Sequence, residues 1–280
     1  MEKIAYMGVP GSYTEEAALG YFENKVKLIG CPGFHDVVDR LLSKNARYAI
    51  LPVENSSTGS IHQTLDLIRQ KNLTIVGEVV QKIEHYLIAV KGTNLSSVKK
   101  VISHPQGLEQ CGDYLRKWGW ELATGVNTAV VAQEVAQKNE RGVAVIASKR
   151  AAEFYGLEIL DEKIQDNNHN STRFVVLSES DDLVVDADKI SLVFIVKNAP
   201  GSLFAAIEGF ATNKVNLIKL ESRPIWDEPW HYFFFMDLEG NVHDENIKKA
   251  IEYLKIHCKS YRLLGNYKKA SFKQEVIHES

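Results

Sequence analysis

The sequence predicts an α/β protein with a two-lobed region followed by a ferredoxin-like βαββαβ unit. From residue 1 to about residue 178, short apolar strands alternate with helices of about ten residues. This alternation is typical of parallel sheets that are covered by helices on both faces. The charged stretch Ser178–Asp188 interrupts it, and a different pattern follows within about eighty residues. The 280 residues therefore indicate two domains joined by a linker.

The first region opens with an apolar strand over residues 3–9 and a turn. Ser12 or Thr14 is the expected N-cap of the next helix, and Glu15 and Glu16 in its first turn suit the helix dipole. The remaining strands are predicted from apolar residues at every second position, and the remaining helices from apolar residues that recur about every 3.6 positions. Strands are expected at 48–55, twice within 74–92, and at 98–104, 121–126, 142–148 and 174–177, and helices at 34–43, 60–70, 106–118, 128–137 and 149–156.

The region after the charged stretch has the order strand, helix, strand, strand, helix, strand, which is the ferredoxin-like order. Its strands are expected at 189–197, 215–223, 230–238 and 259–267, and its helices at 201–213 and 245–257.

Composition narrows the function classes. The formal net charge is -3, which gives no support for nucleic-acid binding, because such binding usually needs a basic face. Cys31, Cys111 and Cys258 are scattered without a CxxC pair, which indicates reduced thiols. No signal peptide is evident, and no apolar run approaches the ~18 residues of a membrane span. We therefore expect a cytoplasmic protein without a membrane partner.

Polar segments follow the strands of the first region. In open parallel sheets, ligands bind beyond the carboxyl ends of strands, where helices begin. Each segment alone has a structural explanation, such as a cap or a turn, but together they suit a small anion bound without a metal. The segments are Gly8–Thr14, Pro52–Ser60, Ser103–Cys111, Val126–Ala129 and Asn170–Phe174.

Motifs for other chemistry are absent from the sequence. It has no GxGxxG after a strand, no P-loop, no HExxH, no His/Cys cluster at zinc spacing and no GxSxG elbow. We therefore expect no metal and no cofactor.

The segments "ENSSTGS", "SHPQGLEQC" and "NSTRF", in this order, closely resemble those of prephenate dehydratases. "PGSL" and "ESRP" are similar to the phenylalanine-binding motifs of the ACT domain attached to that enzyme. The resemblance implies a periplasmic-binding-protein-like catalytic region over 3–178, a linker over 179–189, an ACT domain over 190–268 and a tail over 269–280. It implies a monofunctional lyase that converts prephenate to phenylpyruvate, water and carbon dioxide in phenylalanine biosynthesis. It further implies phenylalanine as an allosteric effector and a homodimer or a tetramer.

In the family pattern the threonine of the TRF motif is essential, which here is Thr172. Its hydroxyl is expected on the leaving oxygen, either as a proton donor or as a polarising hydrogen-bond donor. Arg173 either binds a substrate carboxylate or forms a structural ion pair. Side chains alternate faces along a strand, so the structural pair is favoured.

The resemblance implies further site residues. Asn55, Ser56 and Ser57, with the N–H groups that open a helix at Ser60, are expected at the pyruvyl carboxylate. The full catalytic set is Thr172, Asn55, Ser103, Gln110, Glu54 and His104. The substrate-binding set is Ser12, Ser56, Ser57, Gly59, Ser60, Gln106, Thr128, Ala129, Arg173 and Phe174. The effector set is Ala199, Gly201, Ser202, Leu203, Asn216, Leu217, Glu221, Ser222, Arg223 and Pro224.

Two alternatives stay open. Arogenate dehydratase performs the same chemistry on an amino-acid substrate. A non-catalytic sensor would also have two α/β lobes around a crevice and a ferredoxin-like unit.

Overall fold

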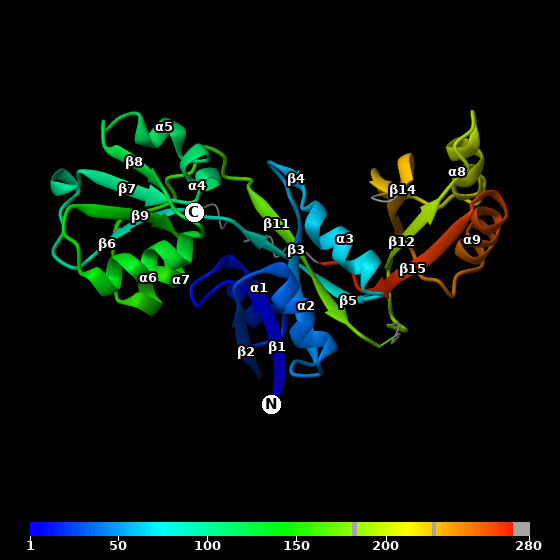
Figure 1. Ribbon diagram of the computed structural model, residues 1–280, viewed down its shortest axis with the longest axis horizontal. Helices are drawn as coiled ribbons and strands as arrows, with labels where there is room; N and C mark the ends of the chain where they lie inside the picture. The colour runs from blue at the N-terminus through cyan, green and yellow to red at the C-terminus, as the bar shows by residue number, and fades with distance from the viewer. Residues whose placement is uncertain (181–183, 226–227, 271–280) are drawn as a thin grey trace, which may run out of the picture. The chain divides into compact units, whose positions relative to one another are not determined.

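The computed structural model describes residues 1–180, 184–225 and 228–270 (Figure 1). The expected linker over 179–189 and the expected tail over 269–280 therefore lie partly outside the described residues. The chain divides into two compact units. One comprises Met1–Thr64 and Val79–Phe174, and the other comprises Leu65–Glu78 and Val175–Ser280.

The first sheet has the strand order β2-β1-β3-β11-β5. Its strands are β1 (Glu2–Met7), β2 (Val26–Cys31), β3 (Tyr48–Asn55), β5 (Thr74–Lys82) and β11 (Ser171–Ser178), and the short β4 (Gly59–Ser60) pairs with β3. β1 runs parallel to both β2 and β3, as the alternating pattern predicts. Helices α1 (Tyr13–Tyr21) and α2 (Phe34–Leu42) connect these strands, and the side chain of Ser12 caps α1.

The second sheet has the order β10-β6-β9-β7-β8 and is mixed, so the expectation of purely parallel sheets is wrong here. Its strands are β6 (Tyr86–Ala89), β7 (Lys100–Ser103), β8 (Glu121–Thr124), β9 (Val143–Ala147) and β10 (Glu158–Asp161). β7 is parallel to β8 and β9, whereas β6 is antiparallel to β9 and β10. Only three residues join β5 to β6, so β6 has no crossover helix that would make it parallel.

Alternate side chains of β9 enter two cores, one on each face of this sheet. Val143, Val145 and Ala147 pack with α6 (Thr128–Lys138) and α7 (Lys149–Tyr155). Ala144 and Ile146 pack on the other face, with Cys111 and Leu115. Both faces of β9 are therefore buried, which explains its continuous apolar run.

Two expected helices differ in the structure. The helix expected over 106–118 is broken into α4 (Pro105–Glu109) and α5 (Gly112–Leu115). The break lies where the Gln110 carbonyl accepts a hydrogen bond from the Asp166 N–H at 2.8 Å. The helix expected from residue 60 begins two residues later, as α3 (His62–Gln70), because Ser60 pairs with Glu54 in the β3–β4 hairpin.

Strand boundaries also differ. The strand expected over 174–177 begins earlier, at Ser171, so Thr172 and Arg173 lie within β11 and not in a loop before it. β2 and β10 were not expected from the sequence. Several residues of β2 are partly exposed, and β10 has only four residues, so neither shows a clear apolar pattern.

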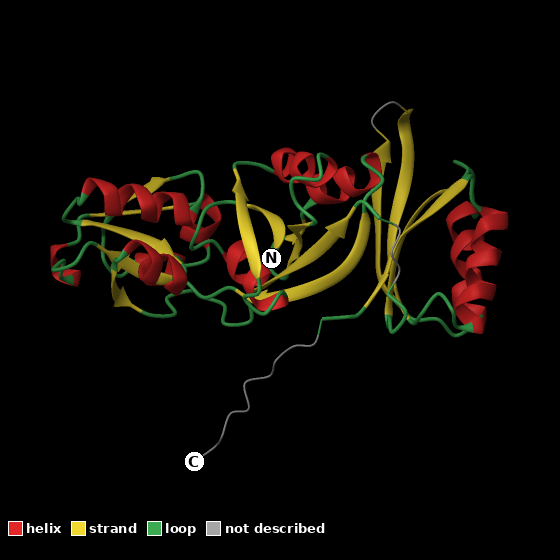
Figure 2. Cartoon of the chain, turned by 90° about the horizontal axis from the view of Figure 1, so that it is seen from below, coloured by secondary structure: helices red, strands yellow, loops and turns green. Residues whose placement is uncertain are grey.

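The ferredoxin-like order is confirmed in the second unit, and with it the predicted fold class. Its elements are β12 (Lys189–Ile195), α8 (Ser202–Thr212), β13 (Leu217–Ile225), β14 (Glu228–Glu239), α9 (Glu245–His257) and β15 (Ser260–Tyr267). The antiparallel sheet has the order β13-β14-β12-β15, and both helices cover one face of it (Figure 2). Their core includes Leu192, Phe210, Met236 and Leu254.

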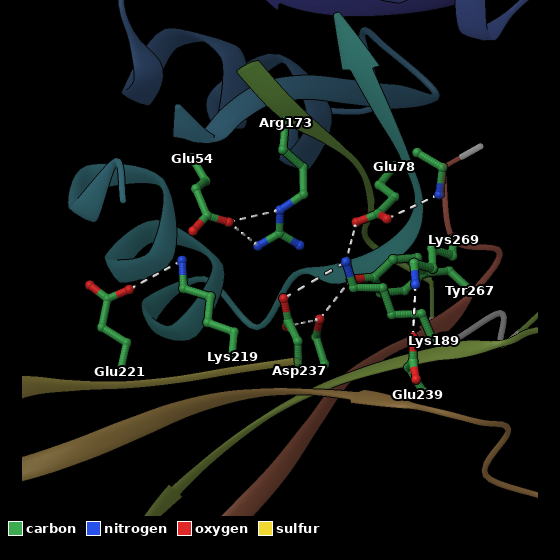
Figure 3. Close-up of polar contacts among 12 residues, drawn as sticks. Glu54, Glu78, Arg173, Lys189, Lys219, Glu221, Asp237, Glu239, Tyr267 and Lys269 are labelled. Carbon is green, nitrogen blue, oxygen red and sulfur yellow. Dashed lines mark hydrogen bonds and ion pairs between the residues drawn. The ribbon is translucent and has the colours of Figure 1, made fainter. Parts of the chain in front are cut away.

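The opposite face of β12 carries a buried ionic cluster (Figure 3). The Lys189 ammonium lies 2.7 Å from a Glu78 carboxylate oxygen and 3.9 Å from an Asp237 oxygen. Ser191 donates a hydrogen bond to Asp237 at 2.6 Å. Buried charges are tolerated only when they are paired and hydrogen-bonded, so this cluster specifies how β5 meets β12 and β14.

Among the described residues, no helix is both long and apolar enough to cross a membrane. Cys31, Cys111 and Cys258 are free thiols.

The contact between α8 and α9 generates a stability prediction. A Cβ atom at Gly209 would lie 2.6 Å from the Tyr253 ring. We expect Gly209→Ala to lower the free energy of unfolding by about 1–3 kcal/mol, because overpacking outweighs the gain of about 1 kcal/mol in helix propensity. Chemical denaturation measures it.

Gly20, in α1, is the matched control, because a Cβ atom there meets nothing within 4 Å. Gly20→Ala is expected to leave stability unchanged or raise it. Equal effects of the two substitutions would contradict the packing argument.

Candidate active site

A cavity of about 380 Å³ lies within the first unit. Side chains from the ends of β1 and β3, and from the starts of β11, α1, α4 and α6, line it. Its lining residues are Met7, Ser12, Tyr13, Thr14, Phe34, Pro52, Asn55, Thr58, Ile61, Ile83, His85, His104, Gln106, Gly107, Gln110, Val126, Asn127, Thr128, Thr172 and Phe174.

The lining contains hydroxyl, amide and imidazole groups, and none of the described residues that form it is a Lys, Arg, Asp or Glu. Any anion in this cavity would therefore be bound by neutral donors and by the positive ends of helices. Two helices of the lining are well capped at the cavity. The Ser12 hydroxyl accepts from the Glu15 N–H at 3.2 Å, and the Asn127 side chain accepts from the Ala129 N–H at 2.9 Å.

Asn55, at the end of β3, organises one wall. Its side chain is 6% exposed and uses both ends of its amide. The Nδ2 group donates to Asn170 Oδ1 at 2.8 Å and to Thr172 Oγ1 at 2.9 Å. The Oδ1 atom accepts from the N–H groups of Ser57 and Thr58 at 3.0 and 3.1 Å. The loop after β3 and the start of β11 are thereby fixed together.

Thr172 and Arg173 point to different sides of β11, as expected for neighbours on a strand. Thr172 and Phe174 line the cavity, whereas Arg173 does not. The Arg173 guanidinium instead contacts the Glu54 carboxylate at 3.0 Å (Figure 3). Both members of this pair lie off the cavity. The ion pair is the arrangement that strand alternation favoured for Arg173, although Arg173 also stood in the expected substrate-binding set and Glu54 in the expected catalytic set.

The structure brings one half of the predicted site residues together on the cavity. These are Ser12, Asn55, His104, Gln106, Gln110, Thr128, Thr172 and Phe174. Gln106 and Gln110 share a side of α4, as their spacing of four residues predicts. Gln106 Nε2 also donates to Thr58 Oγ1 at 3.1 Å.

The other half does not line the cavity. Ser103 is fully buried, and its hydroxyl donates to the Ile146 carbonyl at 2.8 Å. Ser56 bonds to the backbone at the start of β11 through its N–H, at 2.9 Å from the Ser171 oxygen. The idea that Ser60 opens a helix toward the ligand is corrected, because Ser60 belongs to β4. The full set off the cavity is Glu54, Ser56, Ser57, Gly59, Ser60, Ser103, Ala129 and Arg173.

Among the residues of the lining, sequence reasoning missed Tyr13, which is partly buried, and His85, which is buried. Tyr13 lies within the polar segment Gly8–Thr14, and His85 directly precedes the strand β6. A search of all strand junctions for polar residues would have found His85, which lies in the three-residue connection between β5 and β6. The Tyr13 hydroxyl lies 3.0 Å from His85 Nδ1, and His85 Nε2 lies 2.8 Å from Gln110 Oε1.

Burial sets the charge of both side chains. It lowers the pKa of His85 below its usual value, and the hydrogen bond to Gln110 opposes this only in part. Burial likewise raises the pKa of Tyr13, with the nearby Glu16 adding to the rise. The two groups are therefore a neutral imidazole and a neutral phenol near pH 7.

No group of three or more His, Cys, Asp or Glu side chains is placed to hold a metal ion among residues 1–180, 184–225 and 228–270.

A second, smaller cavity of about 170 Å³ lies in the second unit, at the start of α8. Ala199, Ser202 and Leu203 of the expected effector set line it, and Gly201 adopts a left-handed φ of +79° beside it. Asn216 and the β13 members of that set do not line it: Asn216 bonds to Glu239, Glu221 pairs with Lys219, and Arg223 pairs with Asp66. Leu217, Ser222 and Pro224 are also absent from its lining.

Sequence comparison identifies relatives over nearly the whole chain. A bifunctional chorismate mutase/prephenate dehydratase of Aquifex aeolicus is 38% identical over 269 residues, which cover 96% of this chain and 74% of the relative. An arogenate dehydratase/prephenate dehydratase of Arabidopsis thaliana is 36% identical over 277 residues, which cover 95% of this chain and 72% of the relative.

Solved structures share the fold. A prephenate dehydratase from Arthrobacter aurescens in complex with L-Phe superposes with a TM-score of 0.88 at 29% identity, covering 96% of this chain and 90% of the other. A protein titled GqqA, a novel type of quorum quenching acylase, has a TM-score of 0.88 at 30% identity and covers 96% of this chain and 98% of the other.

Residues 190–255 match the family described as ACT domain, and residues 4–182 match the one described as prephenate dehydratase. The chain therefore belongs to the prephenate dehydratase family, with a C-terminal ACT domain.

Proposed function

We propose that this chain converts prephenate to phenylpyruvate, with Thr172 as the hydrogen-bond donor to the departing ring oxygen. Prephenate carries two carboxylates and a ring hydroxyl. One carboxylate leaves as carbon dioxide, its bonding electrons enter the ring, and the ring hydroxyl leaves as water after gaining one proton. Aromatisation drives the reaction, so the protein has to position the substrate and stabilise the departing oxygen.

The hydrogen bond from Asn55 to Thr172 carries this proposal. A hydroxyl has one proton and two lone pairs, and here one lone pair already accepts from Asn55 Nδ2 at 2.9 Å. The described residues provide no acceptor for the Thr172 proton, and the side chain lines the cavity. Thr172 is thus held as a donor toward a ligand, and the amide behind it makes its hydroxyl a stronger donor.

The neutral lining suits a substrate that must lose a carboxylate. A guanidinium or ammonium group would stabilise the carboxylate in the ground state, before it becomes uncharged carbon dioxide. We place the pyruvyl carboxylate at the backbone N–H groups and side chains near Asn127 and Thr128, where α6 begins. Gln106 and Gln110 are placed beside the ring.

The ACT domain is the proposed site of regulation by phenylalanine. Gly201 and the start of α8 would bind the effector carboxylate, and the β13 residues Glu221–Pro224 would come from a second copy of the chain in a homodimer or tetramer. The cytoplasmic location stays a prediction from the sequence.

Arogenate is the competing substrate, because several relatives at 36–38% identity are named arogenate dehydratases. The ratio of kcat/KM for prephenate and for arogenate decides between them. We expect no acylase activity, because no Ser or Thr hydroxyl of the cavity lining bonds to an imidazole in the described part of the chain.

The hydroxyl of Thr172 is tested by two nearly isosteric changes. Thr172→Val removes the donor and is expected to lower kcat for phenylpyruvate formation by about 100- to 10,000-fold, the usual contribution of a positioned proton or hydrogen-bond donor. Thr172→Ser keeps a hydroxyl and should stay within about tenfold of the wild type, since only a methyl group is lost. Near-normal turnover by Thr172→Val would refute the assignment.

Asn55→Asp tests the donor behind Thr172. The new carboxylate still accepts from the Ser57 and Thr58 N–H groups, but it turns the Thr172 proton toward itself. We expect kcat to fall at least about 100-fold while the free energy of unfolding falls by only about 1–3 kcal/mol.

Asn167→Asp is the control, because Asn167 is exposed and its side chain only accepts, from the His169 N–H at 2.9 Å. Asn167→Asp should leave both kcat and the free energy of unfolding unchanged. If Asn55→Asp lowers turnover only in proportion to lost folded protein, Asn55 has a structural role alone.

Gly201→Trp tests the effector site. The bulky side chain would fill the space at the start of α8, so phenylalanine inhibition should be lost while basal turnover remains. Gly92→Trp is a matched control in the first unit, because Gly92 has the same φ of +79° and equally open surroundings. Inhibition curves for both variants check this, and full inhibition of Gly201→Trp would exclude the site.

A further inference from the structure

His85 joins three parts of the first unit at the cavity. It lies between β5 and β6, Tyr13 is the first residue of α1, and Gln110 ends α4. The imidazole is 3% exposed. Its backbone is also held, since its N–H donates to Gln165 Oε1 at 2.9 Å and its carbonyl accepts from the Ile164 N–H at 2.9 Å. The ring therefore has a fixed position and few rotamers.

The tautomer of His85 follows from its neighbours. The Tyr13 hydroxyl lies 2.6 Å from the Glu84 carbonyl and 3.0 Å from His85 Nδ1. The Gln110 oxygen lies 2.8 Å from His85 Nε2 and only accepts, so Nε2 carries the proton of the neutral ring and donates it. Nδ1 is then an acceptor. The Tyr13 proton faces two acceptors, the Glu84 carbonyl and Nδ1, and is shared between them.

The orientation of Gln110 depends on that donor. A glutamine amide has a donor end and an acceptor end, and a half-turn exchanges them. Because Nε2–H of His85 binds the oxygen, the amide nitrogen of Gln110 is the end left for the cavity, which Gln110 lines. An anionic substrate in a cavity without cationic side chains needs donors of this kind.

We propose that His85 is a positioning residue for the dehydratase reaction. It holds the Gln110 amide with its N–H groups toward the substrate, and the Tyr13 hydroxyl beside Nδ1 supports the tautomer that allows this. The inference rests on the proposed function, because Gln110 has a catalytic role only if the cavity binds prephenate.

Two near-isosteric variants distinguish the roles of the two ring nitrogens. In His85→Gln the side-chain amide nitrogen occupies nearly the place of Nε2, so the donor to Gln110 is kept. In His85→Asn the amide reaches only the place of Nδ1, and that donor is lost. We expect His85→Asn to lower kcat about 100-fold with KM changed less than about threefold, as for a misplaced catalytic group.

His85→Gln is expected to keep kcat within about tenfold of the wild type. His35→Asn, on the exposed side of α2, is the matched control and should have no effect. Equal kcat values for His85→Gln and His85→Asn would overturn the proposal, as would an effect on KM alone.

A double-mutant cycle shows whether His85 acts through Gln110. The variant with both His85→Asn and Gln110→Ala should have the kcat of Gln110→Ala alone, within about threefold, because residues that act as a unit are not additive. If the two effects multiply, His85 does not act through Gln110. If the wild type fails to convert prephenate, the proposed function fails, and this is visible before any variant is made.

Nitrogen-15 NMR of histidine-labelled wild-type protein tests the tautomer independently of turnover and of any variant's folding. At pH 7.5 we expect His85 to show a protonated Nε2 and an unprotonated Nδ1. Tyr13→Phe removes the hydroxyl that supports this form at Nδ1 and should shift the signal toward the Nδ1–H tautomer. A wild-type His85 with the proton on Nδ1, or on both nitrogens, would contradict the proposal.

Discussion

The cavity depends on the side-chain amide of Asn55, which ties the loop after β3 to the start of β11. An amide is suited to this position because it combines two donated bonds with an acceptor in a small uncharged group. Its nitrogen donates hydrogen bonds to Asn170 and Thr172, and its oxygen accepts hydrogen bonds from N–H groups of the loop. Leaving either end unbonded in a buried place would cost about 1–3 kcal/mol. The same bonds that close the wall therefore also orient the Thr172 hydroxyl.

The geometry of β11 keeps the Arg173 guanidinium out of the cavity. Arg173 adjoins Thr172 in sequence, but the alternation of side chains along β11 sends it to Glu54 on the other side. The cavity then offers hydroxyl, amide, imidazole and helix N–H groups, which bind an anion without neutralising it. Such an environment is suited to a reaction in which one carboxylate must be bound and a second must be released as carbon dioxide.

The broken helix at Gln110 shows how tertiary contacts shape the site. The sequence over 106–118 favours one continuous helix, yet the Asp166 N–H bonds to the Gln110 carbonyl, and its carboxylate accepts from the Asp113 N–H. These bonds come from a segment more than fifty residues away in the chain. They end α4 at the residue whose side chain meets His85, so the break and the position of Gln110 have one cause.

The sequence by itself determined the α/β class, the ferredoxin-like unit, most strands and helices, and the polar segments that surround the cavity. These follow from local periodicity, caps and turns, because such signals act over a few neighbouring residues. Only the tertiary structure decided that β6 is antiparallel, that Ser60 pairs in a hairpin, and that Ser103 lies off the cavity. It alone brought Tyr13, His85 and Gln110 together. Their contacts join residues that are 25 and 72 positions apart in the sequence, and local sequence patterns cannot predict contacts over such separations.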